Sequence, residues 1–197
     1  MSPSVAVLGF RPHTYWTAVV ALTGDPDAPQ VVERRRVVFA IDLERFIYHQ
    51  AAEADPAQAV AMIAGARAAT EANAAHEIAT LIAELQLIDL DVRAAVAPAG
   101  TAKVPGTLSD ILRSHSAMHA AEGNFYRDVV AAACQAVGLQ VHRVFERDLP
   151  GLVAARLGVY GAELDARLKA MGAALGPPWS EDYRLATLAA WSHLDAH

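Results

Sequence analysis

The order of strand-like and helix-like segments is the feature that most constrains the fold of this chain. Three apolar, β-branched segments fall within the first 40 residues, and the second and third flank the turn sequence Thr23-Gly24-Asp25-Pro26-Asp27. They predict three consecutive antiparallel strands. Two later strand-like segments each follow a helical segment, which predicts parallel additions through right-handed crossovers. The five expected strands are 4–10, 16–22, 30–39, 92–96 and 140–145.

Helical segments separate and follow these strands. Asp55-Pro56 predicts the start of a helix that runs to about residue 87, because an acidic cap followed by proline is a typical helix start. We expect a single helix over 107–137, capped by Thr107 or Ser109 and ended by Gly138. The remaining helices are expected at 42–53, 148–157, 161–175 and 180–194.

These elements predict an α/β fold in which a mixed five-stranded sheet is flanked by helices, within a single domain of residues 1–197. The helical length at about 42–75 exceeds what such a sheet needs, so we interpret it as an elaboration. Its alanine-rich part could pack closely across a two-fold axis. The sequence therefore leaves a homodimer contact and a lid as alternatives.

Composition limits the partners that this protein could have. The formal net charge of −6 gives no general attraction to a polyanion, so binding of nucleic acid would need a local basic patch. The charged run Glu33-Arg34-Arg35-Arg36 is expected to be solvated at a sheet edge. Cys134 lies in an apolar helical run and is expected to be buried and unpaired. Met1–Ser4 reads directly into a strand, and no apolar stretch suits a membrane span, so we expect a cytoplasmic protein without a membrane partner.

Three segments resemble the RuvC-type Holliday junction resolvases. Val7-Leu8-Gly9-Phe10-Arg11-Pro12-His13 is similar to the family's first strand and turn, which end Gly-Ile-Asp-Pro-Gly. The segment from Asp182 to His193 is similar to the closing helix Asp-x-x-Asp-Ala-Leu-Ala-x-Ala-x-x-His, and residues 114–141 resemble the long helix that leads into the fifth strand. The resemblance covers most of the chain in order. It implies a ribonuclease H-like fold and, for the family, a nuclease site in which carboxylates hold two divalent metal ions.

The sequence departs from the family at that site. Arg11 stands at the first-strand aspartate, Ala97 near the fourth-strand glutamate, and Leu185 at one of the two closing aspartates, so that Asp182 alone remains. Two divalent ions about 3.5–4 Å apart require several carboxylate ligands. A cation about 4 Å from them costs roughly 4 kcal/mol per unit charge at an effective dielectric constant near 20. We therefore expect the family's nuclease activity to be lost.

The segment 114–127 carries the other candidate site residues. His115, His119 and Glu122 are spaced i, i+4, i+7 and share one helix face. This set could bind Zn²⁺ or another transition-metal ion, or it could be an ordinary polar stripe on an exposed helix. A third interpretation is an anion pocket in which Arg127 joins Arg11 and His13, because guanidinium groups suit phosphate and carboxylate. The sequence does not decide among the three.

A second cluster lies at residues 176–184. Gly176-Pro177-Pro178 predicts a rigid connection, Trp179 a packing anchor or a ligand contact, and Ser180 a helix cap with acidic residues in the first turn. Asp182 is explained by this helix start and is also the surviving family position.

Two functions remain open at this point. The first is a ribonuclease H-like binding or scaffold protein without two-metal chemistry. The second is an enzyme with a rebuilt site acting on nucleic acid or another phosphate-containing substrate. Its candidate residues are His115, His119, Glu122, Asp182 and Arg127, with a divalent metal ion as the one cofactor suggested.

Overall fold

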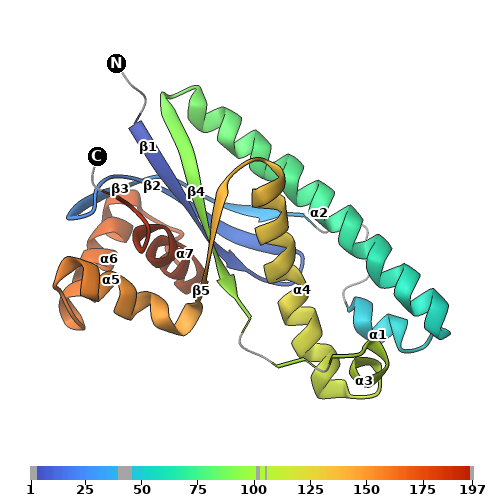
Figure 1. Cartoon of the computed structure of the whole chain (residues 1–197). Helices are drawn as coiled ribbons and strands as arrows, with labels where there is room; N and C mark the ends of the chain where they lie inside the picture. The colour runs from blue at the N-terminus through green and yellow to red at the C-terminus, as the bar shows by residue number, and fades with distance from the viewer. Residues whose placement is uncertain (1–3, 40–45, 101–102, 105, 196–197) are drawn as a thin grey trace.

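A five-stranded mixed sheet forms the centre of the molecule in the computed structural model, which describes residues 4–39, 46–100, 103–104 and 106–195 (Figure 1). The strand order is β3-β2-β1-β4-β5. β1, β2 and β3 pair antiparallel, whereas β4 and β5 extend the sheet in parallel from β1. The strands are β1 (Ser4–Pro12), β2 (Trp16–Asp25), β3 (Ala28–Val38), β4 (Leu90–Ala99) and β5 (Gln140–Phe145). The predicted α/β fold and strand arrangement are confirmed.

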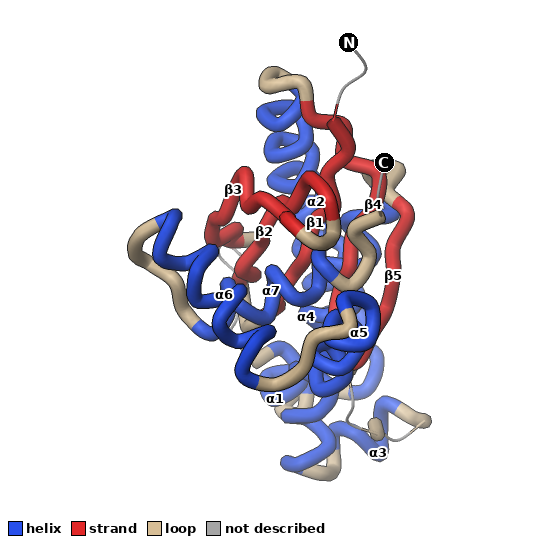
Figure 2. Tube along the Cα trace, turned by 90° about the vertical axis from the view of Figure 1, so that its left-hand side faces the viewer, coloured by secondary structure: helices blue, strands red, loops and turns tan. Residues whose placement is uncertain are grey.

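Helices cover both faces of this sheet. Figure 1 shows α5, α6 and α7 on one side of the sheet and α2 on the other, and Figure 2 views the molecule from the side of α5, α6 and α7. The helices are α1 (Ile47–Ala51), α2 (Pro56–Gln86), α3 (Leu108–Leu112), α4 (His115–Ala136), α5 (Leu149–Leu157), α6 (Ala162–Leu175) and α7 (Glu181–Trp191), with a short 3₁₀ turn η1 (Glu146–Asp148). Alternate side chains of β1 enter two cores: Leu8 packs in the core under α2 and α4, and Val7 in the core under α5–α7.

The expected single helix over 107–137 is wrong, because the structure has two helices there. Thr107 caps α3 and Ser114 caps α4, where the Ser114 hydroxyl accepts a hydrogen bond from the Ala117 N–H. The extended backbone of Ser114 (φ −127°, ψ 115°) is incompatible with a continuous helix. α2 instead runs without a break from the predicted Asp55 cap, whose carboxylate accepts from two N–H groups. Asp42, where the helix expected at 42–53 would begin, lies outside the described residues.

The close packing of α7 on β1 follows from a glycine. A Cβ atom at Gly9 would lie 1.9 Å from the carbonyl oxygen of Ala186 and 2.4 Å from the amide nitrogen of Ala190. Both are backbone atoms of α7, so only glycine permits this approach. It brings the first turn of α7, with Asp182, to the end of β1.

The arginines of β3 are more engaged than expected. Arg34 donates to the carbonyl oxygens of Leu175, Gly176 and Pro177, which join α6 to α7. Arg35 pairs with Glu33 and Glu84, and the Arg36 guanidinium lies 4.1 Å from the centre of the Trp16 ring. β3 lies at the edge of the sheet and these side chains remain partly or fully exposed, as expected, but they also make these specific contacts.

Two further expectations concern the burial of Cys134 and the absence of a helix that could span a membrane. Cys134 is buried and free, and burial raises the pKa of its thiol to about 12, so the thiol stays protonated and unreactive. Over the described part of the chain, none of the helices combines the length and the apolar character that crossing a membrane would need.

Candidate functional site

An arginine occupies the end of β1, where three elements of the fold meet. The Nε atom of Arg11 lies 3.0 Å from Oε2 of Glu146, and Nη1 donates to the carbonyl oxygen of Pro12 at 3.1 Å. Glu146 opens η1 directly after β5, and β4 between the two strands carries the fully buried Ala97. The Arg11 and Glu146 side chains are 20% and 30% exposed, so their charges are only partly screened by water.

The surviving acidic residue is also paired with a basic group. Nε2 of His13 lies 2.6 Å from Oδ1 of Asp182 at the start of α7. The His13 ring stacks on Trp16 with 4.3 Å between ring centres and 10° between planes. Because Trp16 also contacts Arg36, the position of His13 depends on both the β2–β3 hairpin and α7.

A small pocket opens beside Arg11, which we name the strand-end pocket. It has a volume of about 180 Å³ and is lined by Arg11, Pro12, His13, Thr14, Gly123, Tyr126 and Arg127. The guanidinium of Arg127 donates to the Gly123 carbonyl at 2.7 Å and makes no ion pair with any described residue. Burial lowers the pKa of Arg127, and the charge of Arg11 lowers it further, while Glu146 acts in the opposite direction. Two cationic groups thus face one small hollow.

This set of side chains does not fit the two divalent ions that the family resemblance implies. Such ions need several oxygen ligands that are not already paired with basic side chains. Glu146 contacts Arg11 and Asp182 contacts His13, while Ala97 offers no ligand atom. The charged group at the end of β1 is the Arg11 guanidinium, which repels metal ions.

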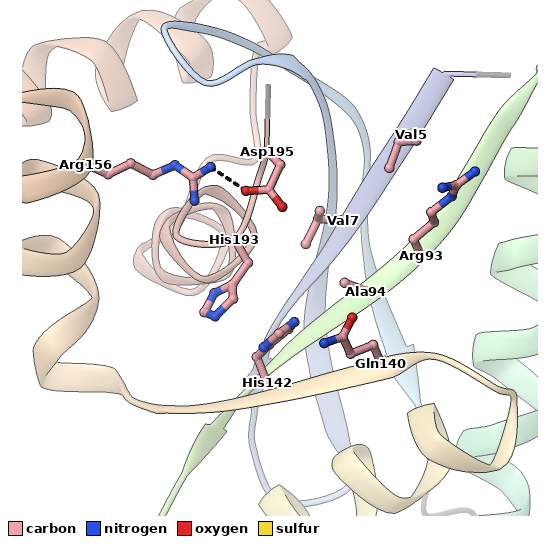
Figure 3. A pocket seen from close by; sticks show the side chains of 9 residues that line it. All are labelled: Val5, Val7, Arg93, Ala94, Gln140, His142, Arg156, His193 and Asp195. Carbon is pink, nitrogen blue, oxygen red and sulfur yellow. Dashed lines mark hydrogen bonds and ion pairs between the residues drawn. The ribbon is translucent and has the colours of Figure 1, made fainter. Parts of the chain in front are cut away.

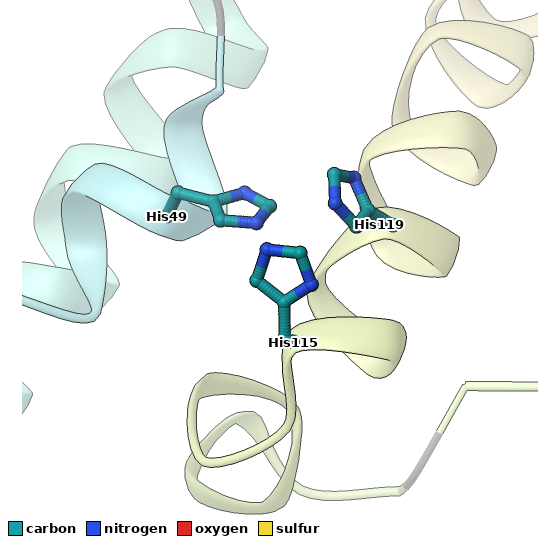
Figure 4. Close-up of side chains that lie close together, drawn as sticks. All are labelled: His49, His115 and His119. Carbon is teal, nitrogen blue, oxygen red and sulfur yellow. The ribbon is translucent and has the colours of Figure 1, made fainter.

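A second group of predicted residues gathers at the start of α4. His115 and His119 meet His49 of α1, and one ring nitrogen from each histidine lies within 4.8 Å of the other two (Figure 4). We name these three residues the histidine cluster. In the described ranges, no other group of three or more histidine, cysteine or acidic side chains could hold a metal ion, and Asp182 does not belong to this one.

Glu122 lies beneath the histidine cluster. Its side chain is only 5% exposed, and Oε1 accepts the Tyr48 N–H at 2.8 Å and lies 3.6 Å from Nδ1 of His49. The second oxygen, Oε2, is buried without a hydrogen-bond partner among the described residues. Burial raises the pKa of Glu122, while the Tyr48 N–H and the neighbouring His49 lower it.

The residues predicted as one catalytic set therefore occupy two places. Arg127 follows His119 by eight positions on α4, which is roughly 12 Å along the helix axis. Asp182 and Arg127 lie at the end of β1, and His115, His119 and Glu122 lie beside α1. Trp179 packs against α6, where a Cβ atom at Gly172 would lie 2.3 Å from its ring, as expected of a packing anchor.

Two residues of these sites were missed in the sequence. His49 was not recognised because its partners are more than 60 positions away in the chain. Glu146 had a usable signal: it directly follows β5, and the carboxyl ends of parallel strands meet at one edge of the sheet, where ligands commonly bind.

Another pocket, of about 350 Å³, lies at the opposite ends of β1 and β5 (Figure 3). It is lined by Val5, Val7, Arg93, Ala94, Gln140, His142, Arg156, His193 and Asp195. The ring centres of His142 and His193 are 4.1 Å apart, and burial, followed by the charges of His142 and Arg156, lowers the pKa of His193. Arg156 is already paired with Asp195 at 2.8 Å.

Solved structures with a similar arrangement of elements include RuvC of Thermus thermophilus. This structure superposes with a TM-score of 0.50 at 12% identity, covering 95% of this chain and 92% of RuvC. The chain has the fold of RuvC. A structure of the Thermus thermophilus RuvC in complex with a Holliday junction substrate gives a TM-score of 0.52 at 11% identity, covering 96% and 92% of the two chains.

The likeness to RuvC is confined to structure. No protein-family model matches the sequence, and no curated protein matches it. The expected ribonuclease H-like fold is confirmed, and at such low identity the RuvC comparison carries the fold alone.

Proposed function

We propose that this RuvC-fold protein binds a phosphate-containing ligand in the strand-end pocket and does not cleave phosphodiesters by two-metal chemistry. The observation that supports this most directly is the position of Arg11, which ends β1 in an ion pair with Glu146 beside Arg127. A basic group at the end of the first strand favours an anion where the family resemblance expects metal ions.

Charge repulsion opposes the binding of two divalent ions at the end of β1. A divalent ion about 4 Å from a guanidinium would be repelled by roughly 4 kcal/mol per unit of its charge at an effective dielectric constant near 20. Protonation does not relieve this repulsion, because arginine stays charged at any physiological pH. Glu146 is paired with Arg11 and is therefore a poor additional metal ligand.

The chemistry of the pocket supports phosphate as the ligand group. Guanidinium groups donate two parallel hydrogen bonds to phosphate oxygens, and such bonds are stronger when the donor is partly withdrawn from water. Arg127 meets that condition, since it is half-buried and has no carboxylate partner among the described residues. A volume of about 180 Å³ suits one phosphate group with part of its carrier.

The phosphate group could belong to a nucleic acid or to a small molecule, and these two possibilities need different probes. One solved RuvC structure contains a Holliday junction, which makes four-way junction DNA the first nucleic-acid probe. The net charge of −6 means that DNA would have to be held by local residues such as Arg11 and Arg127. A nucleoside monophosphate tests the small-ligand version.

The alternative of a rebuilt catalytic site has weaker support. Its five candidate residues fall into two groups, with Arg127 and Asp182 at the strand end and His115, His119 and Glu122 beside α1. The two groups are roughly 12 Å apart along α4, so their side chains would have to reach across that distance to act on one reacting atom.

The first experiment tests cleavage. Purified protein is incubated with four-way junction DNA, single-stranded DNA and RNA in the presence of Mg²⁺ or Mn²⁺. We expect no product above the background of the metal alone. Cleavage that disappears in the Asp182→Asn variant would contradict the proposal, because it would show that the old site still works.

The second experiment tests binding by calorimetry with junction DNA and with a nucleoside monophosphate. The Arg127→Gln variant should bind the preferred probe about tenfold more weakly, which corresponds to the roughly 1.5 kcal/mol of one charge-assisted hydrogen bond. Arg167→Gln is the matched control, because Arg167 pairs with Glu163 on α6 away from the strand-end pocket. Equal affinities for Arg127→Gln and the unchanged protein, or no binding of either probe, would contradict the proposal.

A further inference from the structure

We propose that His49, His115 and His119 bind one transition-metal ion of the zinc type between α1 and α4. The three imidazoles approach one another from two helices (Figure 4), with ring centres 5.1, 4.7 and 4.4 Å apart. The ring planes are inclined by 80°, 54° and 82°, so these contacts are not stacking interactions. This site is independent of the strand-end pocket.

The spacing of the ring nitrogens is close to what a metal ion requires. Histidine nitrogens bind Zn²⁺ at about 2.0–2.1 Å, which places tetrahedral ligands roughly 3.3 Å apart. One nitrogen from each ring already lies within 4.8 Å of the others. His115 and His119 are exposed, and small rotations of their side chains close the remaining distance without moving the core.

The buried Glu122 is a second observation that points to a metal ion. Neither ring nitrogen of His49 has a hydrogen-bond partner among the described residues, and Nδ1 lies 3.6 Å from Glu122 Oε1. A carboxylate behind a metal-binding histidine commonly holds its second nitrogen and fixes the ring orientation. With Nδ1–H directed to Glu122, Nε2 of His49 is the atom left for the metal. A bound cation would also compensate the burial of Glu122 Oε2, which lacks a partner within the described structure.

The ligand set selects the class of ion. Three imidazoles suit Zn²⁺, Cu²⁺ or Ni²⁺, whereas Mg²⁺ prefers oxygen ligands. Three protein ligands leave a fourth position for water, as in zinc sites that are open to solvent. The ion would join α1 of the helical elaboration to α4.

The test uses the full-length chain without a histidine tag. Equilibrium dialysis against Zn²⁺ should give one bound ion per chain, and Co²⁺ should give the visible absorption of a tetrahedral site. His49→Gln and His119→Gln should each lower the affinity by about hundredfold or more, because loss of a ligand exceeds the 10–100-fold effect of an outer partner. His76→Gln is the control, since His76 is exposed on α2 and does not belong to the histidine cluster.

Glu122→Gln separates the positioning role from direct binding. This variant should lower the affinity for the metal ion about 10–100-fold. It should still give the tetrahedral Co²⁺ spectrum, because all three imidazoles remain. Circular dichroism of each variant checks that the fold is kept, and His119→Gln changes only an exposed side chain. Absence of saturable binding in excess Zn²⁺, or affinity that survives both His49→Gln and His119→Gln, would overturn the metal site. Unchanged affinity in Glu122→Gln would overturn the role of that residue.

Discussion

Gly9 decides how closely the last helix can approach the sheet. The space that a Cβ atom would need is taken by the backbone of Ala186 and Ala190, which cannot rotate away as a side chain could. Gly65 offers a contrast, because it lies exposed within α2 and a Cβ atom there would meet nothing within 4 Å. The same substitution should therefore have opposite signs at the two positions.

We predict that Gly9→Ala lowers the free energy of unfolding by about 3 kcal/mol or more, the upper range for overpacking a tight core. Gly65→Ala should raise it by about 0.5–1 kcal/mol, since alanine loses less backbone entropy than glycine in a helix. Urea unfolding followed by circular dichroism measures both. A Gly9→Ala protein as stable as the original would mean that α7 does not pack on β1 as described.

The site residues that could be predicted from the sequence are those that lie together on one helix or at the end of one strand. The spacing of His115, His119 and Glu122 placed them on one helix face, and the position of Arg11 at the end of a strand suggested an anion pocket. The partners His49 and Glu146 come from distant segments, and only tertiary packing brings them to these residues. Sequence spacing alone cannot report such contacts.

Helix starts differ in whether their cap residue is used. Asp55 accepts hydrogen bonds from the N–H groups of Ala57 and Gln58 at the start of α2. Ser180 occupies the equivalent position at α7 but makes no side-chain cap bond. The two residue types predicted the same role, and the structure gives it only to Asp55.

We predict that Asp55→Ala costs about 1 kcal/mol of stability, because two N–H groups lose their acceptor. Ser180→Ala should change the stability by less than about 0.5 kcal/mol, as is usual where no specific interaction is lost. Denaturant midpoints of the two variants, compared with the unchanged protein, provide the measurement. A larger loss for Ser180→Ala than for Asp55→Ala would contradict this interpretation.

Segment type was predictable to the extent that local chemistry decided it. The Asp55-Pro56 start, the five strands and the helices after β5 follow from cap residues and hydrophobic spacing. The break between α3 and α4 was missed because Ser114 lies within a segment of otherwise helical character, and either Ser109 or Thr107 could cap the whole of it. The sequence offers Thr107, Ser109 and Ser114 as hydroxyl caps, and their local spacing does not show that both Thr107 and Ser114 are used.

At the scale of the whole molecule, α2 presents one face to the core and one to solvent. Ala59, Ala66 and Ala74 are buried, whereas Ala64, Ala68 and Ala72 are exposed on the opposite side. Small exposed side chains allow a second helix to approach closely. A homodimer through this face, as the sequence suggested, stays a prediction.

We expect Ala68→Glu to shift the chain toward the monomer in sedimentation equilibrium, because a charge at the centre of that face would be desolvated by a partner helix. Ala83→Glu, exposed near the far end of α2, is the control and should leave the association unchanged. A monomer for the unchanged protein at high concentration would remove the prediction.

The position of α7 has a consequence for how the protein is made. Leu188, Ala189 and Trp191 cover the sheet face that carries Val7, Leu22 and Val96, and the Trp191 indole donates to the Pro26 carbonyl of the β2–β3 turn. These covering residues follow all five strands in the sequence, so they leave the ribosome after the whole sheet has been synthesised. A nascent chain that has not yet released residue 181 would therefore lack the helix that covers this face of the sheet, so the second core can be completed only after α7 has emerged.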